Sequence, residues 1–213
     1  MTDRFLLDPE RVSVGAEGPL PDACGARDRP LHVEIGFGKD VRILRMAAAD
    51  PKALFLGVEI SRKKHASFCR KVARLGLANI RAFHGDARHV LLDLLPERSV
   101  ASFTILFPDP WPKRKHWKNR WITPETAALL ARAIRPPGPL IVATDHEGYR
   151  TQIRDSLQGA GFVLESERNQ VPEDDRTIFT TRFERLGSPV SYLRWHLPSR
   201  RCAGSAANLT HSS

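Results

Sequence analysis

Short apolar runs alternate with helix-patterned segments along most of the chain, and this alternation limits the fold more than any other feature. Buried strands are predicted at residues 31–36, 53–60, 79–84, 100–107 and 140–144. Helical spacing and capping signals predict helices over 41–49, 61–76 and 148–159, and another that starts at Thr123-Pro124. Two more strands, 162–165 and 178–184, follow each other closely and predict an antiparallel edge. The pattern therefore predicts an α/β fold with a mostly parallel, seven-stranded sheet and helices on both faces.

Length and end composition predict one folded domain with two tails. A chain of 213 residues suits a single domain, here residues 31–197. Residues 1–30 are rich in glycine and proline and predict an irregular leader, and residues 198–213 predict a flexible tail. The sequence contains no run of about 18 apolar residues, so no membrane span is predicted, and its first residues lack the pattern of a secretory signal. Three scattered cysteines predict a cytoplasmic protein without a disulfide framework or metal site.

Acidic residues lie at the ends of the first three predicted strands, at the edge where parallel sheets bind ligands. Glu34 precedes the loop Gly36-Phe37-Gly38, Glu59 closes the second strand, and Asp86 follows the third. Glycines allow close backbone approach, whereas acids repel a pyrophosphate and favour a cationic cofactor such as S-adenosylmethionine. The position of Glu59 suits ribose hydroxyls. The alternatives are a structural glycine turn, a solvated Glu59 and a helix-capping Asp86.

The net charge of +9 is concentrated in two segments. Residues 61–81 hold seven lysines and arginines and no acid, and residues 111–121 hold five more, interleaved with three tryptophans. Prolines on both sides of Asp109 restrict the backbone and fix its direction. Basic side chains bind phosphates and aromatic rings stack on exposed bases, so this composition favours an RNA partner. The alternative is a solvated basic loop whose tryptophans, Trp121 above all, are tucked into the core.

Several motifs together resemble the bacterial tRNA (guanine-N7-)-methyltransferases, which have the class I, Rossmann-like methyltransferase fold. In chain order these are EIGFG at 34–38, GVE at 57–59, GDA at 85–87, the proline–tryptophan segment, TDxxxY at 144–149 and TxFE at 181–184. For S-adenosylmethionine, the resemblance implies binding by Glu34, Gly36, Gly38, Glu59, Asp86, Ala87 and Asp109. It implies that Asp109 is also the catalytic acid. For tRNA or its guanine, it implies contacts from Lys113, Asp145, Thr181, Arg182, Phe183 and Glu184.

The function implied by the resemblance is methylation of N7 of a variable-loop guanine, position 46, in tRNA. No metal, membrane or obligatory protein partner is expected. Two departures stand out: Asp40 occupies a position where the family usually has glycine, and Leu186 one where it often has arginine. An RNA-binding protein without catalytic activity is one alternative, which the retained acids argue against. An NAD-dependent oxidoreductase is another, which the incomplete glycine fingerprint disfavours.

Overall fold

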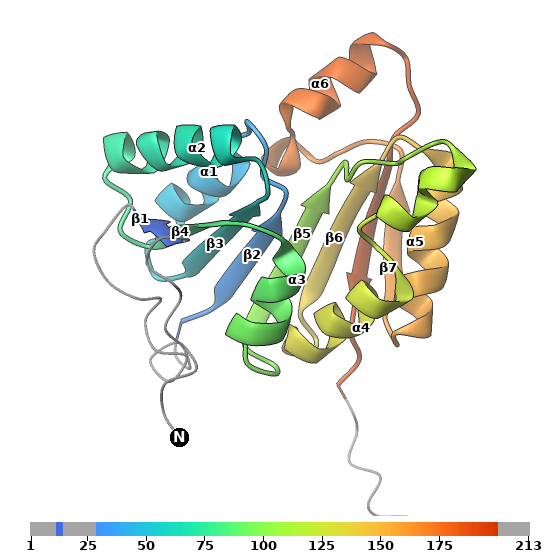
Figure 1. Ribbon diagram of the computed structural model, residues 1–213, viewed down its shortest axis with the longest axis horizontal. Coiled ribbons are helices and arrows are strands. Elements are labelled where there is room, and N and C mark those ends of the chain that lie inside the picture. The colour runs from blue at the N-terminus through green and yellow to red at the C-terminus, as the bar shows by residue number, and fades with distance from the viewer. Residues whose placement is uncertain (1–11, 15–28, 200–213) are drawn as a thin grey trace, which may run out of the picture.

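The computed structural model describes residues 12–14 and 29–199, which form an eight-stranded sheet between two layers of helices (Figure 1). The strands are β1 (Val12–Val14), β2 (Leu31–Ile35), β3 (Leu54–Glu59), β4 (Ile80–His84), β5 (Val100–Leu106), β6 (Pro139–Thr144), β7 (Val163–Arg168) and β8 (Ser191–His196). Their order is β1-β4-β3-β2-β5-β6-β8-β7. The five strands from β2 to β6 pair in parallel, whereas β1, β7 and β8 pair antiparallel. The mostly parallel α/β sheet predicted from the sequence is confirmed.

The helical elements occupy the predicted segments and some others. They are α1 (Arg42–Ala49), α2 (Arg62–Leu75), α3 (Ala87–His89), the π-helical turn η2 (Val90–Leu94), the 3-10 turns η3 (Arg114–Asn119) and η4 (Glu173–Asp175), α4 (Pro124–Ala133), α5 (Glu147–Gly159) and α6 (Ile178–Arg185). Thr123 caps α4 as predicted, with its hydroxyl accepting from the Thr126 N–H. Gly76 ends α2 in the left-handed conformation, φ +63°, which glycine adopts without strain.

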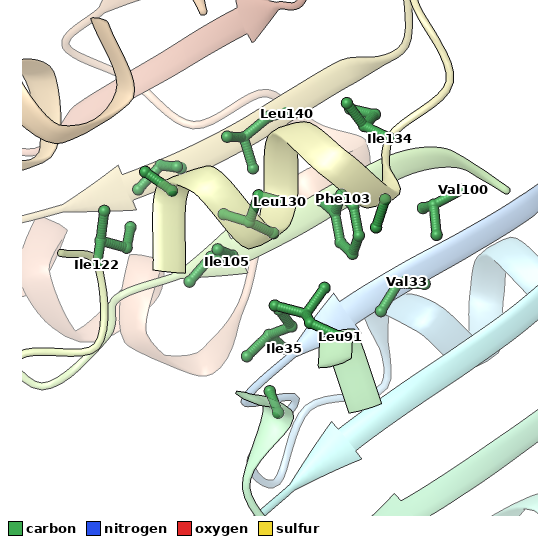
Figure 2. Packing of buried hydrophobic residues seen from close by; sticks show 14 of the residues in the cluster. Val33, Ile35, Leu91, Val100, Phe103, Ile105, Ile122, Leu130, Ile134 and Leu140 are labelled. Atoms are coloured by element: carbon green, nitrogen blue, oxygen red, sulfur yellow. The ribbon is translucent and has the colours of Figure 1, made fainter. Parts of the chain in front are cut away.

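Alternating side chains on the strands explain why helices cover both faces of the sheet. On β3, Phe55 packs into the cluster beneath α1 and α2, while Leu56 packs into the cluster on the opposite face. Figure 2 shows that opposite face, where Leu130 of α4 lies over Phe103 and Ile105 of β5. Each large apolar side chain buried there contributes about 1.5–3 kcal/mol. This two-sided burial accounts for the nearly continuous apolar runs in the sequence.

Two segments differ from their predicted structure. Residues 178–184 form helix α6 and not a strand, because Thr177 and Thr180 make a capping box that begins a helix. The strand beside β7 is instead β8, which pairs antiparallel with both β6 and β7, so the expected antiparallel edge exists with a different member. Within the predicted irregular leader, residues 12–14 form β1 against β4. The other leader residues up to 28, and residues 200–213 of the predicted tail, lie outside the described residues.

Helix α6 lies apart from the two helical layers. In Figure 1 it stands at the top of the view, beyond the upper ends of β5 and β6. It follows η4, and the chain returns from it into the antiparallel strand β8. The helix therefore projects over the edge of the sheet where parallel strands end, which is where ligands bind in folds of this kind.

Candidate active site

A cleft of about 400 Å³ lies at the carboxyl ends of the parallel strands, beside β2 and β5 where the strand order reverses. Six predicted site residues line it: Gly36, Gly38, Glu59, Asp86, Ala87 and Asp109. It is also lined by Lys64, Arg88, Phe107, Trp111, Asn119, Trp121 and Phe179. A larger hollow of about 550 Å³, lined by Arg98, Arg132 and Leu197 among others, lies at the opposite end of the sheet. That hollow contains none of the predicted residues, so the cleft is the candidate site.

The glycine loop after β2 is held by the acid at the end of β3. Gly36 and Gly38 have φ angles of +77° and +63°, which other residues adopt only with strain. The Gly38 N–H donates to Glu59 Oε2 at 2.9 Å, and the Ser61 N–H donates to Glu59 Oε1 at 2.8 Å. Each carboxylate oxygen keeps a second acceptor position. Glu59, which is 4% exposed, therefore shapes the loop and still has acceptor capacity where it lines the cleft.

Glu34 lies behind the cleft in a buried ion network and does not line it. Arg42 donates from Nη1 to Glu34 Oε2 at 2.9 Å and from Nε to Asp175 Oδ1 at 2.6 Å. The Tyr192 hydroxyl donates to the other oxygen of Asp175. Burial raises the pKa of Glu34, because Arg42 is shared with Asp175 and compensates only part of the desolvation. Burial alone would lower the pKa of Arg42, but the two carboxylates raise it.

Asp86 combines the two roles that the sequence left open. Its Oδ1 accepts from the Arg88 N–H at 2.9 Å and caps α3, and Oδ2 accepts from Arg88 Nε at 2.9 Å. Burial would raise the pKa of Asp86, but the hydrogen bonds from Arg88 outweigh it and lower the pKa below its ordinary value. The same side chain lines the cleft next to Ala87. The Asp86 carboxylate therefore caps α3, and the Asp86 side chain also lines the cleft.

The loop that carries Asp109 has a strained backbone on both sides. Phe107 and Trp111 have φ angles of +52° and +42°, which bulky residues adopt rarely and at an energetic cost. Asp109 is exposed between two prolines and lines the cleft. Trp111 also lines the cleft and is 36% exposed. Strain concentrated around one exposed carboxylate is typical of a functional loop.

One of the five cations in the basic segment is structural. Arg120 is buried and donates to the Pro110 carbonyl at 2.8 Å and to Gln152 Oε1 at 2.9 Å. Its guanidinium lies 4.6 Å from the Trp117 ring centroid and 4.9 Å from that of Tyr149. Arg120 therefore fastens the loop to α5, and Trp117 packs on it outside the cleft. The remaining cations are exposed: Lys113, Arg114, Lys115 and Lys118.

None of the predicted substrate residues lines the cleft. Lys113 precedes η3 and Asp145 follows β6, where His146 and not Asp145 caps α5. Thr181, Arg182, Phe183 and Glu184 lie on α6. Glu184 accepts from Arg176 at 2.6 Å, and the Phe183 ring lies 5.1 Å from that of Phe107.

The α6 residue that reaches the cleft is Phe179, which sequence reasoning missed. The sequence predicts a strand over residues 178–184. A strand places every second side chain on one face, and this gives no reason to single out Phe179 as a cleft residue. The capping pattern Thr177-x-x-Thr180 was the available signal, because it predicts a helix that begins directly before Phe179.

The described residues include no group of three or more His, Cys, Asp or Glu side chains arranged to hold a metal ion. Across the same part of the chain, no helix is long and apolar enough to cross a membrane.

Comparison with solved structures identifies the fold. The fold matches the 16S rRNA methyltransferase KamB with a TM-score of 0.65 and 18% identity, over 89% of this chain and 100% of that one. A variant 16S rRNA (adenine(1408)-N(1))-methyltransferase from Catenulisporales acidiphilia, solved with its cosubstrate SAM, matches with a TM-score of 0.59 and 18% identity, over 90% and 98% of the two chains. The fold is that of the class I, Rossmann-like methyltransferases.

Sequence comparison narrows the class to a family. A family model described as "Putative methyltransferase" matches residues 28–191. A tRNA (guanine-N(7)-)-methyltransferase of Nitrosococcus oceani is 41% identical over 180 residues, which cover 84% of this chain and 76% of the relative. The enzyme of that name from Methylococcus capsulatus is 34% identical over 203 residues, 93% of this chain and 84% of the relative. The chain belongs to the tRNA (guanine-N7-)-methyltransferase family.

Proposed function

We propose that this protein transfers a methyl group from S-adenosylmethionine to N7 of a guanine in tRNA, and that the target is the variable-loop guanine at position 46. Family membership supports the reaction. The observation that carries the proposal to this chain is that Glu59, Asp86 and Asp109, from three separate strand ends, line one cleft beside Trp111. Carboxylates suit both a cationic cofactor and a cationic product.

The residues of the cleft fit S-adenosylmethionine. A Cβ placed on Gly36 would meet no atom within 4 Å, so the loop leaves open space on the side where a ligand could approach its backbone. Gly36, Gly38, Glu59, Asp86, Ala87 and Asp109 would hold the cofactor, while Glu34 would act behind them through Arg42. When bound, S-adenosylmethionine supplies an electrophilic methyl group on a sulfonium centre.

The protein's part in the reaction is positioning and charge stabilisation. Guanine N7 carries an in-plane lone pair and needs no base to deprotonate it, so the site must aim this atom correctly. Methylation leaves a positive charge on the purine, which the exposed carboxylate of Asp109 would stabilise. Trp111 is the tryptophan of the basic segment that would stack on the base, because it lines the cleft while Trp117 packs on Arg120.

The tRNA would be held around the rim of the cleft. Exposed cations on and beside η3, Lys113 among them, would bind phosphates in a salt-dependent way. Asp145 and the α6 residues Thr181, Arg182, Phe183 and Glu184 would contact the RNA or its guanine. A cytoplasmic location and the lack of a metal requirement belong to the same proposal.

The direct test is incubation of the protein with labelled S-adenosylmethionine and unmodified tRNA, followed by nucleoside analysis. We expect labelled 7-methylguanosine, and none from a tRNA in which guanine 46 is replaced by adenine. A different methylated nucleoside would overturn the proposed reaction. Label in the substituted tRNA would overturn only the proposed position.

A further inference from the structure

The start of α6 is bound to the loop and helix that follow β2, although 138 residues separate them in the sequence. Asp40 Oδ2 accepts from the Ile178 N–H at 3.0 Å, while Oδ1 accepts from the Val41 N–H at 3.2 Å. Asp40 is only 9% exposed and does not line the cleft. Its carboxylate therefore faces α6 and not the cofactor side of the loop.

A carboxylate is well suited to this position. The first N–H groups of a helix have no partner within the helix, and their partial positive charge attracts an anion. In α6 the Thr177 hydroxyl accepts from the Thr180 N–H at 3.2 Å, which leaves the Ile178 N–H to another acceptor. Asp40 provides that acceptor from a distant part of the chain, so the cap also fixes where the helix stands.

Two neighbouring arginines hold the residues just before α6. Arg45 Nη2 donates to the carbonyls of Asp174 at 3.3 Å and Arg176 at 3.2 Å. Arg42 binds the carboxylate of Asp175 through the buried network already described. Three side chains from residues 40–45 therefore hold four residues between 174 and 178. The approach to α6 and the glycine loop form one connected unit.

This anchoring reaches the cleft through the residue after Ile178. Phe179 lines the cleft, and its ring centroid lies 6.1 Å from that of Phe107, at the base of the Asp109 loop. A shift of the first turn of α6 would move Phe179 and the four proposed RNA contacts that follow it. We propose that Asp40 is a positioning residue that fixes the substrate side of the cleft through α6; the effect on catalysis rests on the proposed function.

The test compares Asp40→Ala and Asp40→Asn with a matched control, Asp50→Ala. Asp50 is an exposed acid at the other end of α1 whose Oδ1 accepts from the N–H groups of Lys52 and Ala53, so it has a similar local role without contact to α6. Three quantities are measured on the full chain: amide hydrogen exchange over residues 178–186, the dissociation constant for S-adenosylmethionine by calorimetry, and kcat and KM for tRNA.

For Asp40→Ala we expect exchange over 178–186 to accelerate about fivefold, the factor that corresponds to loss of one helix cap. We expect kcat/KM for tRNA to fall about tenfold, with cofactor affinity within twofold of wild type. Asp40→Asn retains an acceptor oxygen and should recover part of both losses. Asp50→Ala should leave both quantities unchanged.

Unchanged exchange in Asp40→Ala would overturn the anchoring. Weakened cofactor binding with unchanged tRNA kinetics would assign Asp40 to the cofactor site and overturn the positioning role. If the wild-type protein methylates no tRNA, the proposed function fails, whereas the exchange measurement still decides whether Asp40 anchors α6.

Discussion

The two sides of the cleft are built by different kinds of contact. On the cofactor side, formed by the ends of β2, β3 and β4, the bonds that shape the loops lie within one loop or join consecutive strand ends: Asp86 with Arg88, and Gly38 with Glu59, 21 positions apart. On the substrate side, formed by residues 107–121 and α6, they join distant segments, such as Asp40 with Ile178. Contacts of short or moderate sequence separation therefore shape the loops of the first side, whereas a contact across more than a hundred residues positions α6 on the second.

The two sides of the cleft also differ in the exposure of their charged residues. Glu34 and Glu59 are buried among hydrogen-bond donors, whereas Asp109, Trp111 and Lys113 are exposed. Buried, bonded acids define one fixed shape. Exposed cations and rings on strained or projecting segments can adapt to a large, flexible partner such as RNA. Substitutions should therefore affect stability on the first side and RNA handling on the second.

The largest effect on stability is expected from Arg42→Ala, because the Arg42 side chain joins the two sides of the cleft. Removing one member of a buried ion network leaves Glu34 and Asp175 uncompensated and should lower the free energy of unfolding by about 3–5 kcal/mol. Urea unfolding measures this loss. Arg45→Ala, an exposed residue on the same helix, should cost less than about 1 kcal/mol. Equal losses for the two variants would contradict the role of the buried network.

Asp109→Ala should separate catalysis from stability. Loss of the carboxylate removes stabilisation of the charge on the methylated purine, so kcat should fall about 10²–10³-fold. The melting temperature and the affinity for tRNA should stay close to wild type, because Asp109 is exposed. Asp93→Ala, an exposed acid on η2, serves as control. Unchanged turnover by Asp109→Ala would remove Asp109 from the proposed mechanism.

Tyr149→Phe tests a buried hydrogen bond between α5 and the residue that follows the basic segment. The Tyr149 hydroxyl accepts from the Ile122 N–H at 2.8 Å, and its loss leaves that buried donor without a partner, at a cost of about 1–3 kcal/mol. Thermal unfolding measures the difference. Thr151→Val, which removes a more exposed hydroxyl from the same helix, should cost less.

The same variant carries a pH prediction. Burial raises the pKa of Tyr149 from 10 to about 12, so the neutral form is favoured in the folded state. Its contribution to stability is complete below pH 10 and is lost as the pH rises through about 12. The stability difference between wild type and Tyr149→Phe should therefore shrink over this interval. A difference that grows with pH would contradict the direction of the shift.

The smallest effect is expected from Lys113→Ala combined with Arg114→Ala. Each cation that neutralises a phosphate contributes about 0.9 to the slope of log affinity against log salt for a duplex, so two should lower it by about 1–2. Binding of tRNA at several salt concentrations measures the slope. Lys52→Ala with Arg98→Ala, exposed cations outside the cleft and the basic segment, should leave it unchanged. Equal changes in both pairs would indicate a non-specific charge effect.

Much of the fold could be predicted because its signals are local. Apolar runs of strand length, the Thr123-Pro124 helix start and Gly76 at a helix end each depend on a few neighbouring residues. The acids Glu59 and Asp86 could be assigned to one edge because parallel strands end on the same side. The alternation of strands and helices predicts the edge at which they lie, but not which acids line the cleft, because Glu34 at the same edge does not.

What the sequence alone determined is the α/β sheet, the glycine loop and the edge at which the acids gather, since backbone periodicity and turn chemistry act over short distances. Only the tertiary structure decided that Glu34 lies behind the cleft and that Asp40 faces α6. These outcomes depend on contacts across more than a hundred residues or on which of several donors a carboxylate meets. Local sequence patterns do not indicate either outcome, because both arise only when distant parts of the chain pack together.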